Sequence, residues 1–240
     1  MLLQCNPLLN YCLKKFKAFR SVSENVILFR GIISKKFVIH LPGLTFSEPV
    51  LNSMQELSDF IKTNIPYLRG EDLSFIISKF HAQTLRKKQL LLKRGQIANR
   101  YYYVKSGVMR FIYGENQELT AWIVMPEEFF TEISSFKLQA PTRFHIEAVE
   151  ETELYYIERA DMELLYRQLP AWQEFGRKIW ESMAMRMINE IIRFQTLTVE
   201  ERYREFLQQP GFMQHVSVKQ LASYLGITPN ALSRIRKNIR

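Results

Sequence analysis

The spacing of apolar residues changes twice along the chain. From Leu57 to Phe80 they recur at helical spacing, and Pro66 and Gly70 divide this stretch into two short helices. Residues 84–158 instead predict short strands, rich in aromatic and β-branched side chains and separated by glycine and proline. The expected strands cover residues 89–93, 101–105, 108–113, 119–124, 144–149 and 153–158. Strands that recur every ~8–12 residues are typical of an antiparallel barrel or jelly roll.

Helical spacing returns after the strands. A short helix is expected from Asp161 to Leu169, and Pro170 starts a long one that runs to about Leu197. At ~1.5 Å per residue, roughly 25 residues make a rod of about 40 Å, which is long for one domain and suits pairing with a second copy. The alternative is a helix packed on its own β domain. The residues expected to form the dimer are Ile179, Met183, Met187, Ile191 and Phe194.

The segment that follows is polar. Residues 200–209 predict a helix that Pro210 and Gly211 end, and residues 214–218 predict a short extended lead into the last part of the chain.

Residues 217–240 have the pattern of a helix-turn-helix. Ser217 and Gln220 form a capping box for the first helix, and Gly226 ends that helix in the left-handed conformation. Thr228 is placed to cap the second helix, and Pro229 occupies its first position. The expected turn is therefore tight, as in helix pairs that bind the major groove of DNA.

The outward face of the second helix is polar and basic. Residues 206–240 contain five basic side chains and no acidic one, which suits contact with phosphate. The alternative is an ordinary packed helix pair with a solvated charged face. The residues expected to contact DNA are Thr228, Asn230, Ser233, Arg234, Arg236 and Lys237.

Charge and composition set the N-terminal segment apart. The chain has a net charge of +9, and residues 1–53 hold seven basic and two acidic side chains. Because regular periodicity starts only near Met54, we interpret Met54 as the natural first residue and 1–53 as an upstream extension. The alternative is a genuine basic arm or small subdomain.

Other function classes find little support in the sequence. Cys5 and Cys12 are too few and wrongly spaced for a disulfide framework, a zinc site or an iron–sulfur site. The four histidines are scattered and no nucleophile elbow is present, so we expect neither an enzyme nor a bound metal or cofactor. No apolar run approaches the ~20 residues of a membrane span. The expected location is the cytoplasm.

The order of elements, the turns at Gly95, Gly107 and Gly114, and the C-terminal motif resemble the Crp/Fnr family of bacterial transcription regulators. The resemblance covers roughly residues 54–240. It implies a fold like that of cyclic-nucleotide-binding domains, followed by a DNA-binding domain with a short or absent wing.

The family's phosphate cassette corresponds to residues 126–148. Glu132 matches its ribose-binding carboxylate and Arg143 its phosphate-binding arginine. Thr131 stands where glycine would admit the phosphate, and Phe144 replaces a small hydroxyl residue. We therefore expect a degenerate pocket that does not bind cyclic AMP, in which Glu132 and Arg143 form an ion pair.

The sequence thus predicts an α+β chain with N-terminal helices, an antiparallel β-roll, a long dimerisation helix and a C-terminal helix-turn-helix. The expected domains are the extension (1–53), the sensor domain (54–169), the dimerisation helix (170–197) and the DNA-binding domain (198–240). The expected function is sequence-specific transcription regulation as a homodimer, with double-stranded DNA and RNA polymerase as partners and an unknown effector. The alternative is a ligand-sensing or protein-interaction β-roll that binds nucleic acid only nonspecifically.

Overall fold

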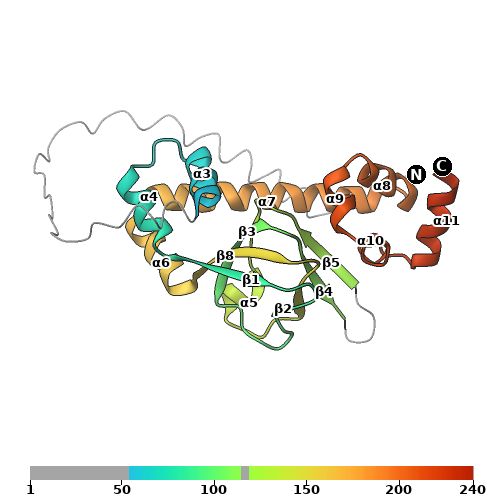
Figure 1. The fold of residues 1–240 in the computed structure, drawn as a ribbon, viewed down its shortest axis with the longest axis horizontal. Helices are drawn as coiled ribbons and strands as arrows, with labels where there is room; N and C mark the ends of the chain where they lie inside the picture. Colours follow the sequence, from blue (N-terminus) through green and yellow to red (C-terminus); the bar gives the residue numbers. More distant parts are fainter. Residues whose placement is uncertain (1–53, 115–118, 240) are drawn as a thin grey trace, which may run out of the picture. The chain divides into compact units, whose positions relative to one another are not determined.

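The computed structural model describes residues 54–114 and 119–239 (Figure 1). The predictions for residues 1–53 and for Arg240 lie outside this part of the chain. The described part begins with helices α3 (Gln55–Asn64) and α4 (Gly70–Ile77), where the apolar spacing predicts them. Their inward residues Leu57, Ile61, Leu73 and Ile76 are buried because they recur on one face of each helix.

Two four-stranded antiparallel sheets form the β-roll. One sheet has the order β1-β8-β3-β6 and the other β2-β7-β4-β5. The strands are β1 (Phe80–Leu85), β2 (Leu90–Leu92), β3 (Arg100–Ser106), β4 (Met109–Tyr113), β5 (Leu119–Val124), β6 (Phe129–Phe130), β7 (Phe144–Ala148) and β8 (Thr152–Glu158). This arrangement confirms the predicted α+β class with an antiparallel roll.

Strand β3 shows how the sequence builds two cores at once. Successive side chains of a strand point to opposite faces. Tyr101 and Tyr103 belong to the core shared with helices α3, α4, α6 and α7, whereas Tyr102 and Val104 belong to the interior of the roll. Buried positions therefore follow one another without a polar gap, as in a strand covered on both sides.

The helices after the roll are α6 (Arg159–Gln168), α7 (Pro170–Thr196), α8 (Val199–Leu207), α9 (Pro210–His215), α10 (Val218–Leu225) and α11 (Pro229–Ile239), with α5 (Ile133–Leu138) between β6 and β7. Figure 1 shows the long α7 beside the roll, with α6 at its start and α8 at its end. Near the start of α7, Trp172 and Phe175 are deeply buried because they complete the core formed with the N-terminal helices.

Four predictions for individual elements were wrong or incomplete. Strand β1 was missed because three of its four middle residues are polar, yet it pairs along its length with β8. Strand β6 and helix α5 were also missed, because with two and six residues they are too short to show a hydrophobic period. Residues 214–218 were expected to be extended, but Pro210 starts helix α9, since proline fits the first turn of a helix. Phe212 of α9 then stacks on Phe206 of α8, with ring centroids 4.7 Å apart.

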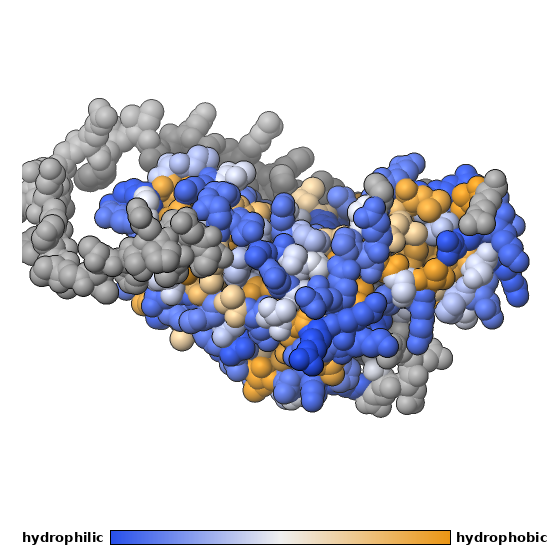
Figure 2. Space-filling view, in the orientation of Figure 1, coloured by the Kyte–Doolittle hydropathy of each residue, from blue (hydrophilic) through white to orange (hydrophobic). Residues whose placement is uncertain are grey.

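Helices α8–α11 share a core with the roll. Val108, Ile123 and Val149 of the roll lie in one buried cluster with Tyr203, Phe206, Leu221 and Leu232. Figure 2 shows a mostly hydrophilic surface on which hydrophobic residues gather over these C-terminal helices. Among the residues that the structure describes, no helix combines the length and apolar character required to cross a lipid bilayer.

Candidate nucleic-acid interface

The C-terminal helix pair α10–α11 is set by its caps. Ser217 Oγ accepts from Gln220 N, and Gln220 Oε1 accepts from Ser217 N, which confirms the predicted capping box. Gly226 has a φ of 77° and ends α10, as predicted. Thr228 Oγ1 accepts from Ala231 N at the start of α11. The turn that joins the two helices therefore has three residues, 226–228.

Buried residues hold α11 on one side and leave the other free. Leu232 is fully buried, and Ile235 and Ile239 pack against the same cluster. Of the residues predicted to contact DNA, Arg236 is half-buried and the rest are exposed, namely Thr228, Asn230, Ser233, Arg234 and Lys237. Within the described residues, Arg234, Arg236 and Lys237 form no ion pair, so their charges are available to an outside anion.

Ser233 and Thr228 have roles within the fold as well. The Ser233 hydroxyl donates to Pro229 O at 2.9 Å, and Thr228 lines a groove together with Leu119 of β5. The side chains of Ser233 and Thr228 are therefore less available for contact with another molecule than those of Arg234 and Lys237.

Strand β5 of the roll contacts α10, the first helix of the pair. Thr120 N donates to Ser223 Oγ of α10 at 2.8 Å, and Tyr224 of α10 is buried. Tyr224 also donates to Glu190 of α7 at 3.3 Å. Burial, followed by the nearby Glu190 carboxylate, raises the pKa of Tyr224, so its hydroxyl stays neutral and remains a donor.

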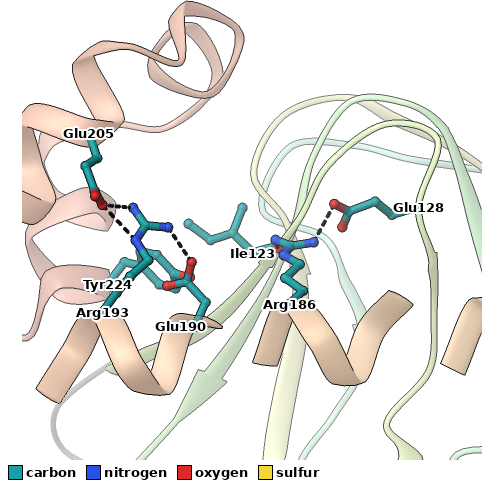
Figure 3. A network of polar contacts seen from close by, with 7 residues as sticks. All are labelled: Ile123, Glu128, Arg186, Glu190, Arg193, Glu205 and Tyr224. Atoms are coloured by element: carbon teal, nitrogen blue, oxygen red, sulfur yellow. Dashed lines mark hydrogen bonds and ion pairs between the residues drawn. The ribbon is translucent and has the colours of Figure 1, made fainter. Parts of the chain in front are cut away.

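Two arginines of α7 link the roll to the C-terminal helices (Figure 3). Arg186 donates to Ile123 O at 2.9 Å and pairs with Glu128 of the roll. About two helical turns further, Arg193 contacts Glu190 at 2.7 Å and Glu205 of α8 at 2.7 Å. Sequence reasoning missed this network because its contacts with the roll join residues some 60 positions apart in the chain.

Arg202 of α8 is a further residue that the sequence did not reveal. It is buried, its guanidinium lies 4.1 Å from the centre of the Phe194 ring, and Nη2 donates to Leu225 O at the end of α10. Burial lowers the pKa of Arg202. A cation at the C-terminus of α10 is favourable because the last carbonyl groups of a helix carry partial negative charge.

The second half of α7 exposes a wide apolar face. Ile179 and Met183, predicted to form the dimer, are half-buried, and Ile179 packs on the core of the roll. The residues predicted to form the dimer did not include three residues of the exposed face, Met185, Ile188 and Ile192. The large apolar side chains exposed on α7 are Met185, Met187, Ile188, Ile191, Ile192 and Phe194, each by 46–59%.

The predicted ion pair between Glu132 and Arg143 is wrong. The buried Glu132 carboxylate caps α5 by accepting from Ser134 N and Ser135 N, both at 3.1 Å, whereas the Arg143 side chain is exposed. A carboxylate next to two orphan amides at a helix start needs no arginine to offset its charge.

The other two cassette positions, Thr131 and Phe144, also make contacts within the fold. Thr131 is buried and donates its hydroxyl proton to Arg100 O at 2.8 Å. Phe144 packs on Phe111 and Tyr113, with ring centroids 5.9 and 5.6 Å away. Since Glu132 occupies the first amides of α5, those donors are not free for a phosphate. Within the described residues, no group of three potential metal-binding side chains occurs.

Comparisons with known proteins agree with this fold. Residues 82–168 match the family model of the cyclic nucleotide-binding domain. No curated protein matches the sequence of the chain.

Three solved structures illustrate the similarity. The c-di-GMP responsive global regulator CLP of Xanthomonas campestris has 20% identity and a TM-score of 0.58, over 71% of this chain and 91% of that one. FixK2 of Bradyrhizobium japonicum has 19% identity and a TM-score of 0.55, over 67% and 84%. A protein of Eubacterium rectale described as a transcriptional regulator of the Crp/Fnr family has 14% identity and a TM-score of 0.58, over 74% and 87%. The described residues therefore have the fold of Crp/Fnr regulators.

Proposed function

We propose that the chain is a bacterial transcription regulator of the Crp/Fnr type that binds specific DNA sequences as a homodimer. A regulator of this kind acts in the cytoplasm, where the genome and RNA polymerase are found, and is not an enzyme. Its β-roll is a sensor domain that does not respond to cyclic AMP.

The observation that carries the proposal is the outer face of α11. Arg234, Lys237 and Asn230 are exposed on a helix whose opposite face is pinned by the buried Leu232. A rigid helix with free polar and basic side chains fits the major groove, where Arg reads guanine and Asn reads adenine. The roles of Thr228, Ser233 and Arg236 in DNA contact belong to the same proposal.

The exposed apolar face of α7 supports the dimer. Six large apolar side chains on one helix form a patch of the kind that marks a protein interface in water. A twofold dimer would present two copies of α11, so its DNA site is expected to be a palindrome with half-sites ~34 Å apart.

Selection of duplexes from a random DNA pool by the whole protein tests the function. We expect a palindromic consensus, and Arg234→Ala should weaken binding to it by about 1–3 kcal/mol and relax one base pair in each half-site. Lys237→Ala should weaken binding to all sequences alike and reduce the salt dependence. Lys62→Ala on α3 is the matched control and should leave both unchanged.

The outcome also decides between the proposal and its alternative. Two results together would favour the alternative, a β-roll module that binds nucleic acid nonspecifically. The selection would enrich no sequence, and wild type and Arg234→Ala would bind every duplex with equal affinity at one salt concentration.

Cyclic AMP binding is tested by calorimetry at about millimolar nucleotide, a concentration that detects affinities near −4 kcal/mol. We expect no saturable heat, because Glu132 already occupies the amides of α5 and Thr131 fills the approach to them. A saturable signal that disappears in Arg143→Ala would show instead that Arg143 binds phosphate.

A further inference from the structure

A cavity lies between the roll and the helices on its outside, and neither Glu132 nor Arg143 lines it. Its volume is about 210 Å³. Strand β3 and helices α5, α6 and α7 form its walls. The lining residues are Tyr101, Ile133, Phe136, Lys137, Met162, Tyr166, Gln173, Gly176, Arg177 and Trp180.

The walls of this cavity are mainly aromatic. The ring of Tyr101 makes edge contacts with Phe136 and Trp180, with centroids 5.8 and 6.2 Å away. Gly176 keeps α7 close to α6, because a methyl group there would lie 2.4 Å from the Tyr166 hydroxyl. An engineered cavity of ~150 Å³ holds benzene, and drug-sized ligands need at least ~300 Å³. The size therefore fits a molecule of one or two rings.

Tyr101 contributes its ring to the cavity wall, and its hydroxyl does not face the cavity. The hydroxyl is closed off from a water-sized probe and makes no hydrogen bond. The polar contact of a ligand in this cavity therefore has to come from the other lining residues.

The charged residues at the cavity are positive. Lys137 and Arg177 contribute to the lining, and no acidic residue does. Arg177 is bonded to Glu181 at 2.7 Å, whereas Lys137, at the end of α5, forms no ion pair with any described residue. The free charge next to an aromatic wall favours an anion with an apolar body.

We propose that this cavity binds a small apolar anion, in which a ring lies among Tyr101, Phe136 and Trp180 and a carboxylate is near Lys137. Because the ligand touches α5, α6 and α7 together, its binding stabilises the attachment of α7 to the roll by mass action. The site does not depend on the proposed DNA binding.

Calorimetry and saturation-transfer NMR on the whole protein test the site, with benzoate and indole-3-carboxylate as probes and benzyl alcohol as the neutral comparison. We expect saturable binding of at least one carboxylate, and binding of benzyl alcohol at least tenfold weaker. Saturable binding of neither carboxylate at about millimolar concentration overturns the proposal.

Variants locate the ligand. Tyr101→Phe keeps the ring and should leave carboxylate binding unchanged, because the hydroxyl does not reach the cavity surface. Lys137→Ala should weaken binding of the carboxylates but not of benzyl alcohol, and Lys62→Ala on α3 should change neither. Unchanged carboxylate affinity in Lys137→Ala would place the ligand elsewhere.

Discussion

At the scale of single residues, Arg110 is a charged side chain enclosed by three strands. It lies opposite Glu147 in the register of β4 and β7, and its guanidinium is 2.9 Å from the Glu147 carboxylate. Nη1 also reaches Thr120 on β5 at 3.5 Å. A buried pair of this kind adds little stability over an apolar pair, but removal of one partner is costly because the other charge stays buried.

We expect Arg110→Met to lower the free energy of unfolding by about 3 kcal/mol. The matched control is Arg204→Met on α8, whose pair with Glu200 is exposed and worth at most about 1 kcal/mol. Urea unfolding of both variants measures the difference. Equal losses in the two variants would mean that the enclosed pair contributes no more than a surface one.

The sequence predicted residues that act locally better than residues that act across the fold. Ser217, Gln220, Gly226 and Thr228 lie where their caps require, because each makes its bonds within a few positions along the chain. Glu132 was paired with the wrong group, since a cassette pattern does not show which amides the carboxylate will reach.

At the scale of elements, α7 divides into two halves with different surroundings. Trp172 and Phe175 are buried in the first half, whereas Ile188, Ile191 and Ile192 are about half-exposed in the second. The spacing of apolar residues is the same in both halves, so the sequence predicted the helix but not which part the roll covers. Strand β1 was missed for the related reason that its partner β8 lies some 70 positions away.

We expect Ile192→Glu to raise the dissociation constant of the proposed dimer by about a hundredfold or more, because in that dimer a glutamate would be buried in an apolar interface. Lys62→Glu introduces a glutamate at an exposed position of α3, outside the apolar face of α7, and should leave the dimer intact. Sedimentation velocity over a range of concentrations distinguishes the two. A dimer that survives Ile192→Glu would need an interface elsewhere.

At the scale of the whole molecule, each of the three hydrophobic cores contains at least one buried tyrosine. Burial raises the pKa of Tyr102 to about 12 and also raises that of Tyr101, Tyr103 and Tyr224. A phenol with a raised pKa stabilises the fold fully below its unfolded value of about 10, and this stability is lost as the pH rises through the folded value.

The chain should therefore unfold in alkali with the ionisation of these tyrosines. At about pH 11, Tyr102 alone should lower the free energy of unfolding by about 1 kcal/mol relative to neutral pH. Urea unfolding at the two pH values measures this loss, which should be smaller in Tyr102→Phe. If the variant lost as much stability as wild type, Tyr102 would not be the titrating group.

The cluster that contains Val108, Ile123 and Val149 also limits how the chain could have been assembled in evolution. Regulators are often viewed as a sensor joined to an exchangeable DNA-reading unit. Here three residues of the roll are 0–3% exposed because α8–α11 cover them, so the two parts share side chains instead of meeting through a linker. Recombination that replaced the C-terminal helices would leave these residues in water unless the new helices matched them. Val108, Ile123 and Val149 should therefore vary together with the C-terminal helices and not with the rest of the roll.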